Sequence, residues 1–527
     1  MTPIRTAVRP PPVSGRGWWI AAAAFVVAGL VMAAWLAAVT PPAFPFGDVA
    51  IIEITTAAAL REPVTLGPYS QFGWHHPGPL LFYLLAPFYA VAGANSIGLA
   101  VGALVLNLLA LGAIGRTLVQ HAGLAAAATV TLVLGAYLLR GGELATSVWN
   151  PHLIVLPLVA LVVLCAAVSC GDGAALVGAT VVASFVAQTS VSVVPVAVAV
   201  AAVAVGLGWK TGRASSGPSG IDGRWFRWAA LAGLVLWLLP LMEQITAPPG
   251  NMTRLLRFFV SETSRGQSWH DAVMAWGDVT TALARPGFEL PWGQAFERRG
   301  SWGTTAVAVT QLVLLVLVAV WARRRGAQAY ARLSLLTALT SVVACWSITR
   351  IVGAIGDYQI FWMSAVGALN LAIVAGAVAL RATEHAPERR RRLVVVMGAL
   401  LGLVAATTTV RGLAGARAYA VNQQDEQAPR RVVADATAEY LSREHVARPL
   451  FRMNATSWLQ AAGVVLHIYR RHGEVAVEPS WVPVFGDALA PDGTEDVVLD
   501  IGGGCPEGRT IVAHADGLCV FAGGRRQ

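Results

Sequence analysis

The chain has 527 residues, of which 56% are hydrophobic and only 13% are charged. Soluble globular domains carry about 25% charged residues, so this composition excludes an ordinary soluble protein. The formal net charge is +9, but Lys and Arg fall in short clusters between long apolar runs. Such clusters are typical of cytoplasmic loops that orient membrane helices, and we therefore expect no nucleic-acid partner.

The apolar runs predict a mainly α-helical, polytopic bundle of about eleven spans in the lipid bilayer, because a helix needs about 20 apolar residues to cross it. The first run is long and no clear cleavage site follows it, which favours a retained helix over a signal peptide. The predicted spans are 18–39, 96–116, 123–139, 151–169, 174–190, 191–208, 228–246, 303–322, 333–351, 359–380 and 393–413.

The segment 77–93 is apolar enough to be a further span, but its length and the distribution of charge argue against this. A helix of its length would reach only about 25 Å, short of the ~30 Å hydrocarbon core. If the segment does not cross and the N-terminus is cytoplasmic, the cytoplasmic regions hold 17 Lys and Arg, whereas the outer loops 40–76 and 140–150 hold one Arg each. The positive-inside rule favours this topology. We expect a juxtamembrane or re-entrant helix here.

This topology divides the chain into three parts. Residues 1–17 form a cytoplasmic tail and residues 18–413 the transmembrane domain, whose outer loops are 40–95, 140–150, 247–302 and 352–358. Residues 414–527 form an extracytoplasmic domain.

The last part has its own pattern, in which helix and strand signals alternate. This indicates a small α/β domain. Cys505 and Cys519 lie in it, and the sequence leaves open whether they form a disulfide or remain two unpaired thiols. Helices are predicted at 429–443 and 458–471, and strands at 449–453, 475–477, 497–501 and 510–514.

The first outer loop concentrates residues that carry chemistry. A carboxylate just beyond a span, Asp48 or Glu53, can take a proton from an acceptor hydroxyl. On a helix the two lie about 140° apart, so they need not act together, and each is alternatively a solvated loop residue or a cap. Tyr69, His75 and His76 are candidates for binding substrate. Adjacent histidines do not share a helix face, so we expect at most one of the pair to bond a sugar hydroxyl or phosphate, and a structural role is the alternative.

Aromatic residues follow in the same loop. At a membrane interface they form either an aromatic belt or a platform for a sugar or lipid. These residues are Trp74, Phe82, Tyr83, Phe88 and Tyr89.

The later outer loops add further candidates for substrate binding. Glu143, Asn150 and His152 stand at the mouth of a span, where polar groups are costly unless paired or hydrated. Arg350, with Asp357 and Tyr358, brackets the loop 352–358. The guanidinium of an arginine can hold a phosphate, and the alternative is an ion pair between Arg350 and Asp357.

The order of these parts resembles the GT-C superfamily of polytopic glycosyltransferases. Its members include lipid A aminoarabinose transferases, protein O-mannosyltransferases and actinobacterial arabinofuranosyltransferases. The layout of residues 18–380 carries the resemblance, and at residue level Gly47-Asp48, Glu53 and His76-Pro-Gly-Pro-Leu-Leu-Phe-Tyr83 carry it. The Ala- and Arg-rich composition points to an actinobacterium.

The resemblance implies an inverting transferase at the outer face of the bacterial plasma membrane. It would use a polyprenyl-phosphate-linked sugar, with arabinofuranose as one candidate, and a cell-envelope glycan, lipid or protein as acceptor. Asp48 is then the base and Glu53 a nearby ligand, while Glu143 is the match for a second acidic residue. Some relatives bind a divalent metal, for which Asp48, Glu53 and His76 are candidates, so the cofactor stays open.

Two other functions remain. A transporter or flippase of a lipid-linked sugar precursor would place charges at the bilayer midplane, commonly in repeated halves, and this sequence shows neither. A non-catalytic member would use its α/β domain to bind a cell-wall polymer or a partner.

Overall fold

The computed structural model describes residues 15–214, 221–262, 265–285, 288–297, 300–384, 386–426 and 428–524. Most of the predicted tail 1–17 lies outside these ranges. The chain forms two compact units. The first unit contains Met1–Phe25 and Leu104–Gly412, and the second unit contains Val26–Ala103 and Leu413–Gln527.

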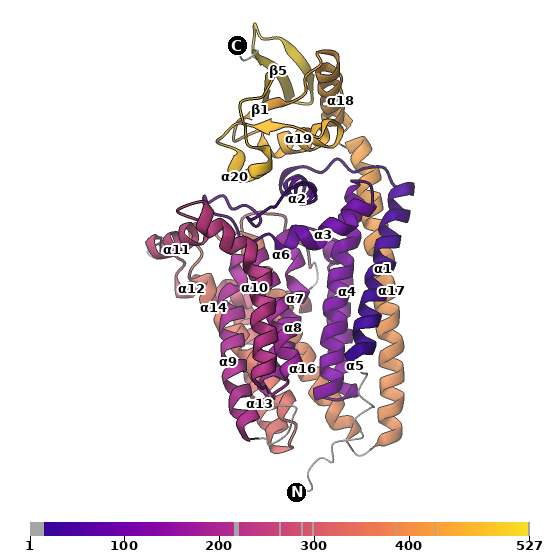
Figure 1. Ribbon diagram of the computed structural model, residues 1–527. Coiled ribbons are helices and arrows are strands. Elements are labelled where there is room, and N and C mark those ends of the chain that lie inside the picture. The colour runs from indigo at the N-terminus through magenta and orange to yellow at the C-terminus, as the bar shows by residue number, and fades with distance from the viewer. Residues whose placement is uncertain are drawn as a thin grey trace. The chain divides into compact units, whose positions relative to one another are not determined.

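In the described ranges, nine helical segments are long and apolar enough to cross a bilayer. Two shorter apolar helices of 17 residues, α5 (Leu124–Arg140) and α8 (Gly173–Thr189), lie at the other two predicted spans, and each is about 25 Å long. The prediction of a polytopic helical membrane bundle is confirmed, with nine helices of the described ranges meeting both criteria (Figure 1). The long segments are α1 (Gly15–Val39), α4 (Ser96–His121), α6 (Asn150–Leu153) with α7 (Val155–Ser169), α9 (Val194–Ala214), α10 (Gly223–Thr246), α13 (Trp302–Arg324), α14 (Gln328–Ile348), α15 (Asp357–Ile360) with α16 (Met363–Thr383), and α17 (Pro387–Glu426).

Polar caps fix the start of several of these helices. The Asp222 carboxylate accepts hydrogen bonds from backbone amides of the first turn of α10, and Asp172 does the same for α8. Ser301 and Thr304 form a reciprocal capping box at the start of α13. Each cap satisfies amides that have no partner within the helix, so these starts are encoded locally.

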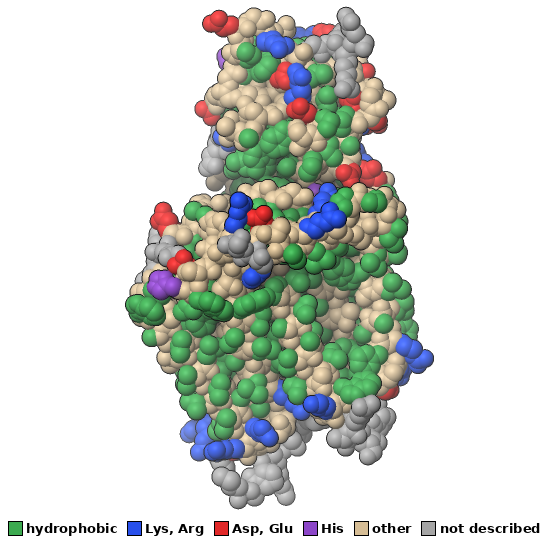
Figure 2. Space-filling view, turned by 90° about the vertical axis from the view of Figure 1, so that its left-hand side faces the viewer, with side chains coloured by type: hydrophobic (Ala, Val, Ile, Leu, Met, Phe, Trp, Pro, Cys, Tyr) green, Lys and Arg blue, Asp and Glu red, His purple; other side chains and the backbone are tan. Residues whose placement is uncertain are grey.

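Burial divides the helices of the first unit into two kinds. Every residue of α7 is buried, and α7 packs against α8, α9 and α14. In contrast, α10 and α13 expose many Leu and Val side chains. Figure 2 shows that hydrophobic side chains cover the middle of the helices on one face, with Lys and Arg beyond both edges of this band. Such a surface suits contact with lipid acyl chains flanked by a charged interface.

The doubtful segment 77–93 forms one short helix, α3 (Leu80–Val91), which begins after Pro79 and contains Pro87. Twelve residues make a helix of about 18 Å. This is too short to cross the bilayer, and the prediction that the segment is not a span is confirmed.

The aromatic residues of this region do not form the expected surface. Trp74, Phe82, Phe88 and Tyr89 are buried, and Tyr83 is partly buried, with its hydroxyl bonded to the backbone of Val64. Both the aromatic belt and the exposed platform are therefore wrong for this group. These rings fill the core of the second unit instead.

The C-terminal domain contains a five-stranded sheet of order β2-β1-β3-β5-β4. The strands β1 (Pro449–Met453), β2 (Ala476–Val477) and β3 (Val497–Gly502) are parallel. The strands β4 (Ile511–Ala515) and β5 (Leu518–Gly524) extend it antiparallel. The four predicted strands and both predicted helices are confirmed, the helices as α18 (Ala428–Arg443) and α19 (Trp458–His472). A short helix, α20 (Val482–Phe485), follows β2.

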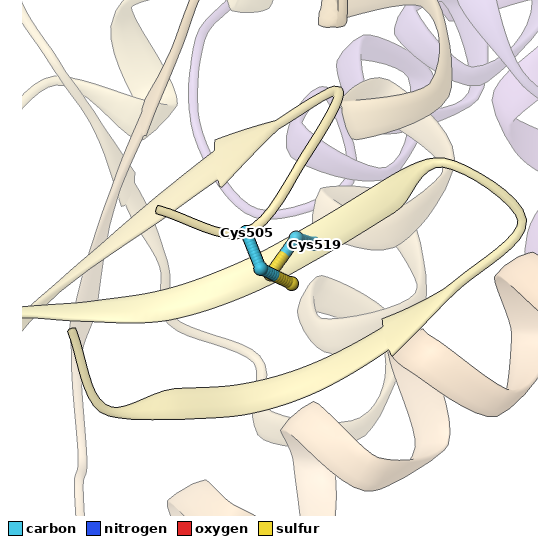
Figure 3. Close-up of a disulfide and its surroundings, with 2 residues drawn as sticks. All are labelled: Cys505 and Cys519. Atoms are coloured by element: carbon cyan, nitrogen blue, oxygen red, sulfur yellow. A yellow bond between two sulfur atoms is a disulfide. The ribbon is translucent and has the colours of Figure 1, made fainter. Parts of the chain in front are cut away.

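The strand β5 was not predicted, although a signal for it exists. Asp516 and Gly517 between β4 and β5 both have positive φ, at 47° and 70°. An Asp-Gly pair with two positive φ angles is the favoured tight turn of a β-hairpin. Of the two alternatives left open for the cysteines, the structure contains the disulfide: Cys519 on β5 bonds to Cys505, with Cα atoms 5.4 Å apart (Figure 3).

Candidate functional site

The predicted site residues fall into two groups, one in each unit. The group of the second unit surrounds the short helix α2 (Gly47–Ala58) and is called here the α2 cluster. The group of the first unit surrounds the start of α6 and is called the α6 cluster. The α2 cluster contains Asp48, Glu53, Tyr69, His75 and His76, and the α6 cluster contains Asn150, His152, Asp357 and Tyr358.

Asp48 lies in the first turn of α2. The positive end of the helix dipole there stabilises a carboxylate. The Tyr69 hydroxyl donates a hydrogen bond to Asp48 Oδ1 at 2.7 Å. An ionised carboxylate whose orientation is fixed by a donor is a suitable proton acceptor, so the geometry is compatible with Asp48 as a general base.

A compact loop positions Tyr69. Its backbone pairs with that of His75 in an antiparallel bridge, and the His76 amide donates to the Pro68 carbonyl at 2.8 Å. The Tyr69 ring contacts the Trp458 ring edge to face, with centroids 5.9 Å apart. Three of the predicted residues are therefore brought together by backbone pairing within one loop.

His76 lies in a different electrostatic environment from the one expected for a phosphate ligand. Its ring is packed among protein atoms, including the Trp74 ring at 5.7 Å. This desolvation, together with repulsion from His75, lowers the pKa of His76 to about 3. The imidazole is therefore neutral near pH 7, and it can exchange hydrogen bonds with a substrate but cannot supply a positive charge to a phosphate.

Glu53 is fully buried and surrounded by donors. Its carboxylate accepts hydrogen bonds from the Tyr89 hydroxyl at 2.9 Å and the Ser96 hydroxyl at 2.7 Å. The Arg470 guanidinium donates from Nε at 2.8 Å and also from Nη2. Although burial opposes the charge of Arg470, Glu53 keeps the pKa of Arg470 above its ordinary value. Glu53 is thus neither a solvated loop residue nor a helix cap.

This arrangement bears on the suggested metal site. In the ranges that the structure describes, no group of three or more His, Cys, Asp and Glu side chains could hold a metal ion. Of the three candidates, Glu53 is paired with the cationic Arg470, which would repel a divalent ion. The donor set of Asp48, Glu53 and His76 therefore does not fit a metal ion.

In the α6 cluster, His152 is fully buried with both ring nitrogens engaged. Nε2 lies 2.9 Å from the Pro291 carbonyl oxygen, and Nδ1 lies 2.8 Å from the Ser147 hydroxyl. Because a carbonyl only accepts, Nε2 carries the proton and Nδ1 accepts from Ser147. The Trp292 and Trp149 rings contact the imidazole at 4.9 and 5.1 Å. His152 therefore fixes the loop at Pro291 and Trp292.

Asp357 is held by the same loop. Its carboxylate accepts from the Gly293 amide at 3.2 Å and from the Tyr358 amide at 2.6 Å. No ion pair joins Asp357 to Arg350 in the part of the chain that the structure describes, so the alternative of an ion pair between them is not found. The Tyr358 ring lies 5.7 Å from the Trp149 ring.

The remaining candidates differ in their surroundings. Asn150 is buried, and its amide donates to the Thr189 carbonyl at 3.2 Å. Arg350 is partly exposed. Glu143 is exposed on a 3-10 turn (Gly142–Ala145), and no described residue forms a hydrogen bond or ion pair with its carboxylate. The structure thus brings Asn150, but not Glu143, into the α6 cluster.

Comparison with known proteins identifies the fold. No protein-family model matches the sequence, and a search of curated proteins finds no match. Two crystal structures of ArnT from Cupriavidus metallidurans match with a TM-score of 0.52 over 97% of this chain and 98% of that chain. The identity is 13% for the apo structure and 14% for the structure bound to undecaprenyl phosphate. ArnT is a GT-C protein. The chain has the GT-C fold.

Three residues of these clusters were not predicted. Arg470 and Trp458 lie in the C-terminal domain, and Arg470 is 417 residues from its partner Glu53. No local pattern could indicate that contact. Trp292 stands in the sequence Pro-Trp-Gly of a large outer loop, where a lone aromatic residue flanked by turn formers is the only signal.

Proposed function

We propose that this multi-pass membrane protein is a glycosyltransferase that moves a sugar from a polyprenyl-phosphate donor to a hydroxyl of the cell envelope. The observation that carries the proposal is the GT-C fold, shared with ArnT along nearly the whole of both chains. One of those ArnT structures is bound to undecaprenyl phosphate. The placement of Asp48 at the N-terminus of α2, oriented by Tyr69, supports it.

Asp48 is the proposed general base. It accepts the proton of the acceptor hydroxyl while the acceptor oxygen attacks the anomeric carbon of the donor sugar. The bond from that carbon to the phosphate oxygen breaks, and polyprenyl phosphate leaves with the bonding electrons. A single displacement of this kind inverts the anomeric configuration. General base catalysis contributes about 10²- to 10⁴-fold to such a step.

The donor phosphate needs a positive partner. The neutral His76 does not provide one, whereas Arg350 is a partly exposed residue, and a guanidinium can hold a phosphate through several donors. We therefore assign phosphate binding to Arg350. Glu53, Tyr69, His75, Asn150, His152, Asp357 and Tyr358 remain proposals as substrate-binding residues, and the hydrogen bonds of Glu53 favour a positioning role for it.

The proposed orientation of the protein in the membrane follows from the distribution of Lys and Arg. We place residues 1–17 and the basic clusters in the cytoplasm, and the active site and residues 414–527 outside the plasma membrane, because Lys and Arg orient spans in this way. Arabinofuranose is the proposed sugar, and a cell-wall glycan of an actinobacterium is the proposed acceptor. A disulfide between Cys505 and Cys519 suits an oxidising compartment.

The test is a transfer assay with the purified protein in proteoliposomes. Decaprenyl-phosphate-linked arabinofuranose and a lipid-linked hexose serve as labelled donors, and an arabinan oligosaccharide serves as acceptor. Asp48→Asn is expected to lower kcat by about 10²- to 10⁴-fold. Glu62→Gln, an exposed carboxylate of the same loop, is the matched control and should leave kcat unchanged.

Three results would contradict parts of this proposal. Full turnover by Asp48→Asn would remove Asp48 as the base. Transfer of the hexose but not of arabinofuranose would correct the sugar. Movement of the labelled donor across the bilayer without any transfer would replace the transferase with a flippase.

A further inference from the structure

We propose that helix α19 of the C-terminal domain is a positioning element for the catalytic carboxylate, so that this domain is an obligatory part of the transferase. The inference rests on the proposed role of Asp48. It concerns contacts within the second unit, where α19 packs along α2. Arg470 near the end of α19 and Trp458 at its start are the positioning residues.

Arg470 joins three segments through one guanidinium. Nε and Nη2 contact the Glu53 carboxylate in the middle of α2, and Nη2 also donates to the Ser96 hydroxyl at 2.6 Å. Nη1 donates to the Ala43 carbonyl at 2.9 Å, in the chain that leads into α2. Because the guanidinium is planar and its donors point in fixed directions, this contact sets both the rotation of α2 and the path of the chain before it.

The start of α19 acts on the other end of α2. Trp458 packs its ring against Tyr69, whose hydroxyl donates to Asp48. The next residue, Leu459, approaches Gly47 so closely that a Cβ there would lie 2.8 Å from Leu459 Cδ2. Gly47 also has a φ of +54°, which starts the helix in a conformation that favours glycine. The base is therefore held by α19 from the side of Tyr69 and from the helix start.

The middle of α19 also lies close to the chain that precedes α2. A Cβ at Gly463 would lie 2.8 Å from the Pro45 carbonyl oxygen and 2.9 Å from the Phe44 ring. Only glycine permits this distance. Hydrogen bonds near the end of α19, aromatic packing at its start and the close contact at Gly463 hold α2 and the chain that leads into it against α19.

A buried ion pair is a weak source of stability, since well-packed apolar residues of similar volume are often as good or better. Its distinctive contribution is directional. A displacement of about 1 Å of a reacting group can cost about 10²-fold in rate, so directional control of α2 has a catalytic consequence. The structure thus assigns Glu53 and Arg470 the role of holding α2 so that the Asp48 carboxylate keeps its position.

The experiment compares Arg470→Met, the double variant Glu53→Gln/Arg470→Met and the control Arg452→Met. Arg452 forms a bidentate pair with Asp500 in the same domain, at 2.7 and 2.9 Å. Two experiments are made on the full-length protein. One measures hydrogen exchange of residues 47–58, and the other measures kcat and KM for the lipid-linked donor. Exchange of α7 reports whether the bundle remains folded.

Arg470→Met should accelerate exchange in 47–58 about tenfold or more. It should lower kcat by about 10- to 100-fold with a smaller change in KM. The double variant should regain thermal stability but not kcat, because its neutral partners no longer orient α2. Arg452→Met should match the wild type in both measurements.

Recovery of both stability and kcat in the double variant would overturn the proposal, since the pair would then be structural only. Unchanged exchange of α2 in Arg470→Met would overturn it as well. If the wild type transfers no sugar, the proposed function fails, whereas the exchange measurement still decides whether α19 holds α2.

Discussion

The pair of Glu53 and Arg470 gives a stability prediction with a definite size. Glu53→Gln leaves the Arg470 guanidinium largely buried without its carboxylate, and Arg470→Met leaves a fully buried carboxylate without its cation. Removing one partner of a buried pair typically costs about 3–5 kcal/mol, because the remaining charge cannot be solvated. In Arg470→Met, the Tyr89 and Ser96 hydroxyls still donate hydrogen bonds to the Glu53 carboxylate. We therefore expect the loss of unfolding free energy in this variant to lie at the lower end of that range, at about 3 kcal/mol.

The double variant should behave differently from the sum of the single variants. Glu53→Gln with Arg470→Met removes both charges, and a neutral pair of similar volume is often as stable as the ion pair. We expect a loss of about 1 kcal/mol or less in the double variant, and hence a coupling free energy of about 5 kcal/mol or more. The control pair, Arg452 and Asp500, is partly exposed, and such pairs contribute about 1 kcal/mol or less.

The assay is reversible denaturant unfolding in detergent micelles, followed by tryptophan fluorescence. Trp458 lies at the opposite end of α19 from Arg470, packs against Tyr69 and reports on the second unit. A coupling free energy below about 1 kcal/mol would refute the reasoning, because it would mean that water reaches Glu53 or Arg470. Equal losses for Arg470→Met and Arg452→Met would refute it for the same reason.

Three further predictions concern the same unit. Tyr69→Phe removes the hydrogen bond to Asp48 and should lower kcat about tenfold with little change in thermal stability, whereas an unchanged kcat would show that the bond does not orient the base. His76 is neutral in the folded protein, with a pKa of about 3, and the unfolded chain takes up its proton near pH 6.5. The folded state therefore loses stability as pH falls, by at most about 1.6 kcal/mol between pH 6.5 and pH 5, and His76→Gln should remove this part of the slope in unfolding measured at the two pH values. Replacing Cys505 and Cys519 together with Ser should lower the stability of the C-terminal domain by about 3 kcal/mol, given their separation of 14 residues, while an unchanged unfolding midpoint with and without reductant would contradict this.

The sequence by itself determined that the chain is a polytopic helical membrane protein and where most of its apolar helices lie. Each membrane helix satisfies its own backbone hydrogen bonds, so length and hydropathy are local properties that can be read along the chain. The same holds for α3, where Pro79, Pro87 and a short apolar run mark a helix that does not cross. The alternating pattern of the C-terminal domain is local too, and even the missed strand β5 was indicated by the Asp516-Gly517 turn.

The tertiary structure alone decided which polar groups meet. Glu53 and Asp48 looked alike in the sequence, yet one is fully buried against an arginine 417 residues away and the other accepts a tyrosine hydroxyl at the start of the same helix. His152 likewise finds its partner in Pro291, from a distant loop. Such pairings depend on long-range packing and desolvation, which no local pattern encodes. The surroundings of each candidate residue were therefore decided only by the tertiary structure.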